Sequence, residues 1–402
     1  MIFNYRGRDA GGTAVSGTIE ADNRQRAIEE LRQRGIVVTS CQEAVAARPQ
    51  QRERFVRRSI GRRDLALFCR QLATMLGAGL PIINALNILQ KQAEKAALRE
   101  SIAALCRDLE AGEAFYRALE RQPRIFSPIF TYTVEAGELG GTLTETLQQL
   151  AEHLQREHEL EEKVKSALTY PAVVSVVALL VIGFLLAYIL PTFRIMLFSL
   201  ELPLPWPTRL LLEISELLRR CWPLIFLAVA GASFGLYRLS RQPRGRYQLD
   251  RLLLRLPIYG PLYHKTVLSR FSRTLGTLLH SGVPLLLALE VVQRTVGNLV
   301  VAEAVARARE NIRDGQSLAT PLEDSGLFPP MLIEMIIVGE EAGALDTLLT
   351  KVSAFYDLEV TETAVRLSSL IEPLLILLLG SIVGLVVMAV LLPVFTMYGG
   401  LQ

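Results

Sequence analysis

The apolar residues of the chain are concentrated in a few long runs. Residues 172–190 (AVVSVVALLVIGFLLAYIL) and residues 373–402 contain no Asp, Glu, Lys or Arg. Each run is long enough to cross a hydrocarbon core of about 30 Å as an α-helix. A third uncharged run, rich in Leu, Ala and Phe, lies between Arg220 and Arg238, and its alternative interpretation is a buried helix of a soluble domain. We therefore expect three transmembrane helices, at 170–191, 221–239 and 372–393. Pro171 and Pro373, at the membrane boundary, suit a helix start or a kink there.

Outside these runs, the sequence has the period of amphipathic helices. In two stretches an apolar residue recurs every three or four positions, which places it on one face of a helix. The two stripes are Leu65, Phe68, Leu72 and Leu76, and Leu143, Leu147, Leu150 and Leu154. After the first stripe, Gly79 and Pro81 are typical of a helix end followed by the start of another helix.

The chain contains an internal repeat. Residues 68–81 (FCRQLATMLGAGLP) recur with an offset of 203 as residues 271–284 (FSRTLGTLLHSGVP), so that Gly282 and Pro284 correspond to Gly79 and Pro81. With an offset of 202, Gly137, Glu138 and Gly141 correspond to Gly339, Glu340 and Gly343, Pro171 corresponds to Pro373, and Pro191 corresponds to Pro393. A period this long indicates a duplicated domain rather than a solenoid. We predict a mainly α, integral membrane protein with two homologous cytoplasmic antiparallel bundles of about six helices each, at 64–168 and 240–371.

The first 43 residues follow a different pattern. Glycines separate short β-prone pieces, an amphipathic helix with Ala27, Ile28 and Leu31 follows, and residues 36–38 form a further β-prone piece. The pattern predicts a small ββαβ-type α/β unit over 1–43, too small to be secure alone. Residues 44–63 then form a linker with many arginines and one acid, Glu53. Its alternative interpretations are a solvated linker, a contact with anionic lipid headgroups and, with less support, nucleic-acid binding.

The distribution of Lys and Arg orients the predicted spans. Basic residues precede the first span and crowd the end of the second, and such residues favour the cytoplasmic side of a membrane. These residues are Arg156, Lys163 and Lys165, and then Arg238, Arg241, Arg244, Arg246, Arg251 and Arg255. Arg219 and Arg220 oppose this bias but are outnumbered. The loop at 192–220 and the tail at 394–402 are therefore expected to face outward, and residues 1–168 and 240–371 to be cytoplasmic.

Composition excludes several classes of protein. The chain has 402 residues, half of them apolar, and a net charge of +3, which suggests two to four compact units and does not indicate nucleic-acid binding. Four cysteines without C-x-x-C spacing argue against a disulfide framework or a zinc ribbon. No apolar run of signal-peptide length follows Met1, so we expect the start of the chain to remain in the cytoplasm.

Motifs of known catalytic chemistry are missing from the sequence. There is no G-x-x-x-x-G-K, no H-E-x-x-H and no G-x-S-x-G, so the sequence indicates neither a P-loop ATPase, nor a zinc protease, nor an α/β-hydrolase. His153 and His158 are five residues apart, which does not place them on one helix face for a metal. The spans carry no ionisable residue at mid-depth, which argues against an ion-coupled transporter. We expect no catalytic residue, no cofactor and no metal.

The repeated Gly-Glu-x-x-Gly-x-Leu is the most specific local pattern. One interpretation is a corner between helices, in which the first Gly ends a helix, the second allows a close approach and the Glu caps the next helix. In the other, Glu138 and Glu340 face a basic partner or a bound cation. Glycine pairs with small-x-x-x-small spacing in the spans, Gly231 with Gly235 and Gly380 with Gly384, are weak indications of helix packing and oligomerisation.

The motifs together resemble a known family. Residues 163–171 with the span that follows, the doubled Gly-Glu-x-x-Gly-x-Leu, the segment 371–373 and the opening F-x-Y-x-G-x-D resemble the polytopic inner-membrane F-type proteins of bacterial type II secretion and type IV pilus assembly. The resemblance covers nearly the whole chain, and within the family the MSHA-type pilus branch is most similar. The second copy departs from the first, since Val365 and Glu372 stand where the first copy has Lys163 and Tyr170.

The resemblance implies a non-enzymatic platform in the bacterial inner membrane, multi-pass, with a cytoplasmic N-terminus and a periplasmic C-terminus. Its implied partners are a separate cytoplasmic assembly ATPase, pilins or pseudopilins, other inner-membrane assembly proteins, further copies of itself and the lipid bilayer. The family-motif residues, with structural or partner-contact roles, are Gly79, Pro81, Gly137, Glu138, Gly141, Tyr170, Pro171, Pro191, Gly282, Pro284, Gly339, Glu340, Gly343, Glu372, Pro373 and Pro393. The rival hypotheses are a subunit of a membrane transporter or channel and a membrane-anchored signalling scaffold.

Overall fold

The structure is a computed structural model. It describes residues 2–8, 14–21, 23–33, 35–43, 60–189, 191–192, 206–257 and 259–399. The chain divides into two compact units, Met1–Ser59 and Ile60–Gln402. Most of the linker predicted at 44–63 lies outside the described residues, so its alternative interpretations stay open.

The N-terminal unit is a small sheet with one helix. Strands β1 (Ile2–Arg8), β2 (Ala14–Glu20) and β3 (Val37–Glu43) form an antiparallel sheet in the order β2-β1-β3, and helix α1 (Arg24–Gln33) connects β2 to β3. The buried apolar side chains of this unit are those of Ile19, Ala27 and Leu31. A core of this size contributes little stability by itself.

The first helical module follows the predicted apolar stripes. Its helices are α2 (Arg62–Gly77), α3 (Ile82–Gln92), α4 (Ala96–Glu110), α5 (Phe115–Glu120), α6 (Pro128–Leu139) and α7 (Leu143–Phe184). Phe68 and Leu72 on α2 and Leu147 and Leu150 on α7 are buried in one core. The side chains spaced for one helix face therefore do face the interior, as the period predicted.

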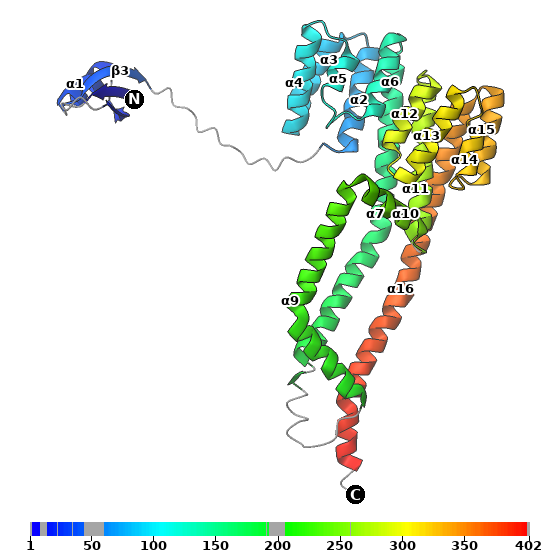
Figure 1. The fold of residues 1–402 in the computed structure, drawn as a ribbon. Helices are drawn as coiled ribbons and strands as arrows, with labels where there is room; N and C mark the ends of the chain where they lie inside the picture. The colour runs from blue at the N-terminus through cyan, green and yellow to red at the C-terminus, as the bar shows by residue number, and fades with distance from the viewer. Residues whose placement is uncertain are drawn as a thin grey trace. The chain divides into compact units, whose positions relative to one another are not determined.

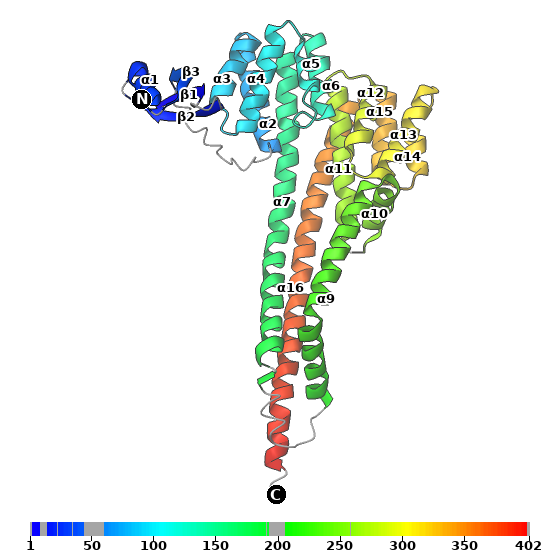
Figure 2. The ribbon, with the colours of Figure 1, turned by 60° about the vertical axis from the view of Figure 1, so that its left-hand side comes forward.

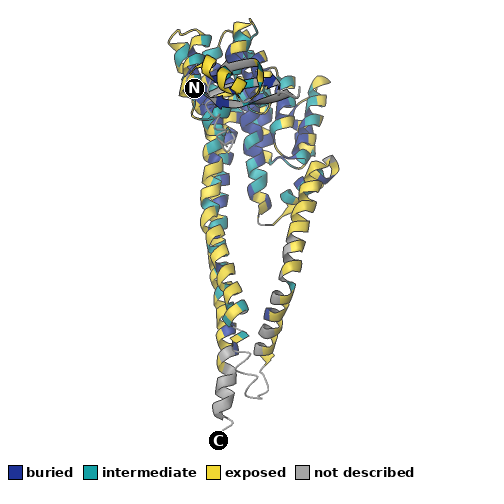
Figure 3. Cartoon of the chain, turned by 90° about the vertical axis from the view of Figure 1, so that its left-hand side faces the viewer, coloured by how far each residue is buried: buried dark blue, intermediate teal, exposed yellow. Residues whose placement is uncertain are grey.

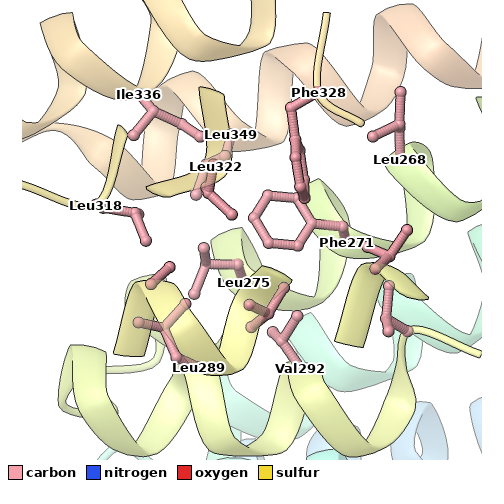
Figure 4. Packing of buried hydrophobic residues seen from close by; sticks show 14 of the residues in the cluster. Leu268, Phe271, Leu275, Leu289, Val292, Leu318, Leu322, Phe328, Ile336 and Leu349 are labelled. Carbon is pink, nitrogen blue, oxygen red and sulfur yellow. The ribbon is translucent and has the colours of Figure 1, made fainter. Parts of the chain in front are cut away.

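The second module repeats this arrangement. Its helices are α11 (Tyr259–His280), α12 (Leu285–Thr295), α13 (Leu299–Arg313), α14 (Ala319–Asp324), α15 (Pro330–Ala342) and α16 (Leu345–Gly399), preceded by α10 (Pro243–Arg255). Its core gathers Phe271, Phe328 and Leu349 with other buried side chains (Figure 4). The Phe271 and Phe328 ring centroids are 5.1 Å apart, and the equivalent rings of Phe68 and Phe126 are 6.3 Å apart. The prediction of a mainly helical chain with two homologous modules is confirmed.

The Gly-x-Pro turn has the same backbone geometry in both modules. Gly79 and Gly282 have φ angles of +83° and +81°, values that a residue without a Cβ adopts at little cost. The amide after each glycine donates across the helix end, from Leu80 N to Met75 O and from Val283 N to Leu278 O, both at 3.0 Å. Pro81 and Pro284 then stand immediately before α3 and α12, so each pair ends one helix and starts the next.

Long helices extend from the modules. Helix α7, continued by the π-helical turn η1 (Leu185–Ile189), and helix α16 run out of the bundles side by side, and α9 (Trp206–Arg241) runs beside them (Figures 1 and 2). Their outer parts are largely exposed, in contrast to the bundles (Figure 3). Within the described residues, the helices over Leu143–Ile189 and Leu345–Ala389 are long and apolar enough to cross a membrane.

Three expectations about these segments need correction. Residues 206–220 belong to α9 and not to a loop, and residues 394–399 continue α16 rather than forming a tail. Neither Pro171 nor Pro373 starts a helix, because α7 and α16 pass through these positions without interruption. The Pro171 ring removes one backbone donor without ending α7, and the carbonyl left without its helical partner is that of Ala167, four residues earlier.

Candidate functional site

The carboxylates of the repeated motif cap short helices. Both oxygens of Glu138 accept from the first turn of α5, from the amides of Phe115 and Tyr116 at 2.8 Å each. In the second module, Glu340 Oε1 accepts from the amide of Leu318 at 2.8 Å, and Oε2 accepts from the hydroxyl of Ser317 at 2.6 Å. A negative charge at a helix N-terminus satisfies free amides and interacts favourably with the helix dipole. Glu138 thus ties the last turn of α6 to the short helix α5, and Glu340 ties the last turns of α15 to the short helix α14.

This arrangement corrects the predicted corner. The capped helices α5 and α14 precede the motif in sequence, whereas we expected the Glu to cap the helix that follows. The roles of the two glycines are also exchanged. Gly141 and Gly343 end α6 and α15 with φ angles of +72° and +64°, and these are the positions that favour glycine.

The first glycine of each motif allows the close approach. A Cβ at Gly137 would lie 2.6 Å from Thr146 Cβ on α7. A Cβ at Gly339 would lie 2.9 Å from Leu345 Cα at the start of α16. Such contacts are far shorter than van der Waals distances, so a side chain here would push the two helices apart. The motif therefore fixes how each module holds the helix that leaves it.

Metal binding at the repeated glutamates gains no support from the described residues. No group of three or more His, Cys, Asp and Glu residues that could hold a metal ion occurs among them. Both glutamates already accept hydrogen bonds from their own module. The described geometry thus fits the structural interpretation of these glutamates better than cation binding.

The two modules pack directly on one another. Helix α12 contacts α6, and α11 contacts both α6 and α7. Ile129 of α6 is buried in the core of the second module, and Tyr132 and Ala136 pack against it. Polar contacts cross the same boundary, from Ser281 Oγ to Gln149 Oε1 at 2.8 Å and between His153 Nδ1 and Thr277 Oγ1 at 3.2 Å.

A charged cluster lies within this boundary. Glu157 on α7 pairs with Arg62 at 2.8 Å and lies 3.7 Å from Arg270 of the second module. Burial alone raises the pKa of Glu157, but His153 and the arginines outweigh burial, so this pKa is lowered overall. Burial lowers the pKa of His153 to about 4, so the imidazole is neutral at pH 7. The cluster holds the modules together through a carboxylate shared between them.

Next to this cluster, an arginine is almost completely buried. Arg273, which is 5% exposed, pairs with Asp357 of α16 and donates to Ser269. Among the residues that the structure describes, its Nε has no hydrogen-bond partner. A cavity of about 340 Å³ adjoins it between α7, α11 and α16. Arg273 thus connects the module boundary to α16, whose later residues form an apolar segment.

Further along the long helices, the predicted boundary residues come together. Tyr170 Oη donates to Glu372 Oε1 at 3.4 Å, and these two residues occupy equivalent positions in the repeat. Pro171 is buried beside a small cavity between α7 and α16 that Tyr170 and Glu372 also line. Above them, Leu160 packs with Val360 and Ala364. The two long helices are therefore in contact where their charged part ends and their apolar part begins.

The remaining predicted residues lie apart from this contact. Pro373 is exposed on α16. Pro191 follows the π-helical turn, separated from it by a residue outside the described ranges. Pro393 lies within α16, and its side chain is outside the described part. The structure thus brings Tyr170, Pro171 and Glu372 together, and places the other prolines elsewhere.

Sequence reasoning missed the polar residues between the modules. His153 was considered only as a metal ligand, and Glu157, Arg270 and Arg273 were not singled out. The repeat contained a usable signal, because Leu67 and Phe355 stand at the positions equivalent to Arg270 and His153. Such a change of chemistry between two otherwise similar copies indicates that the equivalent surfaces have different neighbours.

Comparison with known protein families decides the relationship. The model of the type II secretion system protein F family matches residues 68–191 and again residues 271–393, and the model of that protein's N-terminal domain matches residues 1–42. The chain belongs to the type II secretion system protein F family. The two matches of one model coincide with the two copies of the repeat, and the resemblance noted from the motifs is confirmed.

Relatives of this family align with the chain over almost its whole length. A type IV pilus assembly protein PilC of Thermus thermophilus is 44% identical, over 100% of this chain and 99% of the relative. A type II secretion system protein F of Xanthomonas campestris is 35% identical, over 98% of each chain. A type IV pilus assembly protein TapC of Aeromonas hydrophila is 34% identical, over 98% of this chain and 95% of the relative.

Proposed function

We propose that this family member is an inner-membrane platform protein of type IV pilus or type II secretion assembly in a bacterium. The observation that carries the proposal is the continuity of α7 and α16, each of which belongs to a module core at one end and is apolar and exposed at the other. A helix that is buried in a module and then crosses a bilayer couples the two mechanically, because its backbone hydrogen bonds are continuous.

We further propose that α9 is a third span. It carries the uncharged run between Arg220 and Arg238, and exposed apolar side chains such as Leu224, Leu227 and Phe234 support contact with lipid. With three spans, the distribution of Lys and Arg favours a cytoplasmic position for the N-terminal unit and for the modules at 64–168 and 240–371. The C-terminal end of α16 then lies in the periplasm.

The proposed partners follow from the pilus and secretion systems named for the relatives. They are a separate cytoplasmic assembly ATPase, pilins or pseudopilins, and other inner-membrane assembly proteins, with further copies of this chain beside it. In the proposed mechanism, the ATPase rotates or tilts the paired modules. Helices α7 and α16 transmit this displacement to the bilayer, where the subunits to be assembled are held.

The mechanism is tested by lowering the helical stability of α7 between the first module and the membrane. Lys165, Ser166 and Thr169 are exposed on this helix, and changing all three to Gly weakens it by about 3 kcal/mol relative to changing all three to Ala. Both triple variants replace the same side chains, so the alanine variant is the matched control. In a strain that lacks its own copy of the gene, surface pili or secreted substrate are counted alongside the amount of protein in the membrane.

We expect the alanine variant to support assembly and the glycine variant to lose most of it at an equal protein level. Equal assembly by both variants would reject transmission through α7. Failure of the unmodified chain to restore assembly in any host that lacks its platform protein would reject the platform function itself.

A further inference from the structure

The two modules contact one another through unlike faces. Apart from the contact between the long helices α7 and α16, the first module uses α6 and α7, and the second uses α11 and α12. In the repeat, α6 and α7 are equivalent to α15 and α16, and α11 and α12 are equivalent to α2 and α3. Helices α3 and α15, both described throughout, do not pack together and lie at opposite sides of the module pair (Figure 1). The α2/α3 side of the first module is equivalent to the side that the second module uses, but it is uncovered. The α15/α16 side of the second module is equivalent to the side that the first module uses, and it is also uncovered.

Apolar side chains are exposed on both uncovered faces. On the α2/α3 face, defined by Leu67, Thr74, Ala78 and Ile88, Leu67 is 55% exposed and Ile88 is 38% exposed. The residue equivalent to Ile88 is Val291, which is completely buried in the second module. The same position is thus covered in one module and open in the other.

The opposite face shows the same contrast. On the α15/α16 face, defined by Val338 and Phe355, Val338 is 47% exposed and Phe355 is 44% exposed. Lys351, one turn before Phe355, also lines the cavity between α7, α11 and α16. The residue equivalent to Val338 is Ala136, which packs against the second module. The residue equivalent to Phe355 is His153, which is 5% exposed at the module boundary. Exposed apolar residues that are gathered on one face, rather than scattered singly, mark sites of association.

The direction of the long helices limits how copies can repeat this contact. Helices α7 and α16 leave their modules in the same sense and run side by side (Figures 1 and 2). The rotation that relates the modules therefore has its axis close to the direction of these helices. Copies embedded in one bilayer must keep that direction, and a head-to-tail contact repeated about such an axis forms a ring if the rotation closes.

We propose that the α15/α16 face of one copy docks on the α2/α3 face of a second copy, repeating between chains the contact that the two modules make within a chain. This inference deepens the proposed function, on which its biological role rests. The occupant is a second copy, because the module boundary itself shows which surface covers each of these faces. The contact is heterologous, so it joins the second module of one chain to the first module of the next.

The test uses residue pairs equivalent to a contact within the chain. Gln149 and Ser281 touch across the module boundary. Their equivalents are Lys351, at the edge of the α15/α16 face, and Ala78, on the α2/α3 face, and both are exposed. In a background without native cysteines, one tagged chain carries Ala78→Cys and a second, differently tagged chain carries Lys351→Cys. The chains are co-expressed in membranes and treated with a short bismaleimide.

We expect a cross-linked product that carries both tags, and no product from either single variant alone. A chain with both cysteines should give a ladder of multimers. The positive control is a chain with Gln149→Cys and Ser281→Cys, which should cross-link within itself. Absence of the mixed product when this control reacts would overturn the inference, and so would efficient cross-linking of Ala78→Cys to itself, because that result indicates an isologous contact.

A second pair of variants tests the apolar side chains. Ile88→Asp combined with Val338→Asp should reduce the yield of the mixed product at least tenfold. Leu252→Asp, which changes an exposed leucine on α10 outside both faces, should leave the yield unchanged, and an unchanged yield in the double variant would contradict the role of these faces. Cross-linking without restored pilus assembly would reject only the platform function. Restored assembly without cross-linking would reject only this interface.

Discussion

Glu138 offers the sharpest test of how the modules are held together. Its two carboxylate oxygens are the acceptors for the amides of Phe115 and Tyr116. Ala114, which precedes α5, offers no side-chain cap. A helix of six residues does not form by itself in water. The stability of α5 therefore depends on Glu138 and on the burial of Phe115 and Leu119 in the core.

The expected effect of Glu138→Ala follows from these two contacts. A hydrogen bond to a charged group contributes about 1.5–3 kcal/mol when the site is buried. Because Glu138 is only half-buried, we take the lower end for each bond and expect a loss of about 3 kcal/mol. Since 1.4 kcal/mol is a factor of ten, local opening of α5 should become about 100-fold more frequent. Glu138→Gln keeps one acceptor oxygen and should lose about half as much free energy.

Hydrogen exchange read by mass spectrometry on the purified full chain measures this effect directly. Amides of 115–120 should exchange about 100-fold faster in Glu138→Ala, and those of 318–324 should not change. Glu340→Ala should give the reverse pattern. Glu145→Gln, which changes an exposed glutamate in the first turn of α7, is the control and should change neither segment. Unchanged exchange in 115–120 after Glu138→Ala would refute the capping role.

Two further predictions concern the helix contacts and the module boundary. Gly137→Ala should destabilise the chain by about 1–3 kcal/mol, because the added methyl group overlaps Thr146. Urea unfolding measures the free energy of unfolding, with Gly77→Ala as the control. An equal loss of unfolding free energy in the two variants would contradict the close approach of α6 and α7. His153 has a pKa lowered from 6.5 to about 4 in the folded chain, so the unfolded state binds the proton first and stability should fall by about 3 kcal/mol as the pH falls from 6.5 to 4. His153→Asn should remove that part of the pH dependence, and an unchanged pH profile would show that His153 is not buried in a neutral form.

The sequence predicted the features that depend on local pattern. The period of Phe68 and Leu72 identified the buried face of α2, because burial of one helix face needs only a repeat of three to four residues. Gly79 with Pro81 identified a helix end, because a left-handed backbone followed by a fixed φ is a local requirement. The duplication then carried both predictions to the second module without further assumptions.

Features that depend on distant contacts could not be obtained in this way. One interpretation of the motif around Glu138 was a helix corner in which the Glu caps the helix that follows. The helix named there was wrong, because the capped amides lie more than twenty residues earlier in the chain. The contact of Glu157 with Arg270 joins two modules, and a sequence repeat specifies an equivalence but not the rotation that relates the copies. Pro171 was expected at a helix start or kink, and the structure contradicts the start, because α7 begins at Leu143 and passes through this proline.

The central claim is that both modules lie on the same side of the membrane and are continuous with helices that cross it. Glu100 and Glu303 are exposed at equivalent positions of the two modules, and Glu213 is exposed near the start of α9. Each is changed to Cys in a chain without native cysteines, and intact spheroplasts are treated with a membrane-impermeant maleimide. The account predicts labelling of Glu213→Cys only, with Glu100→Cys and Glu303→Cys labelled after permeabilisation. Labelling of just one of the two module positions in intact spheroplasts would contradict it.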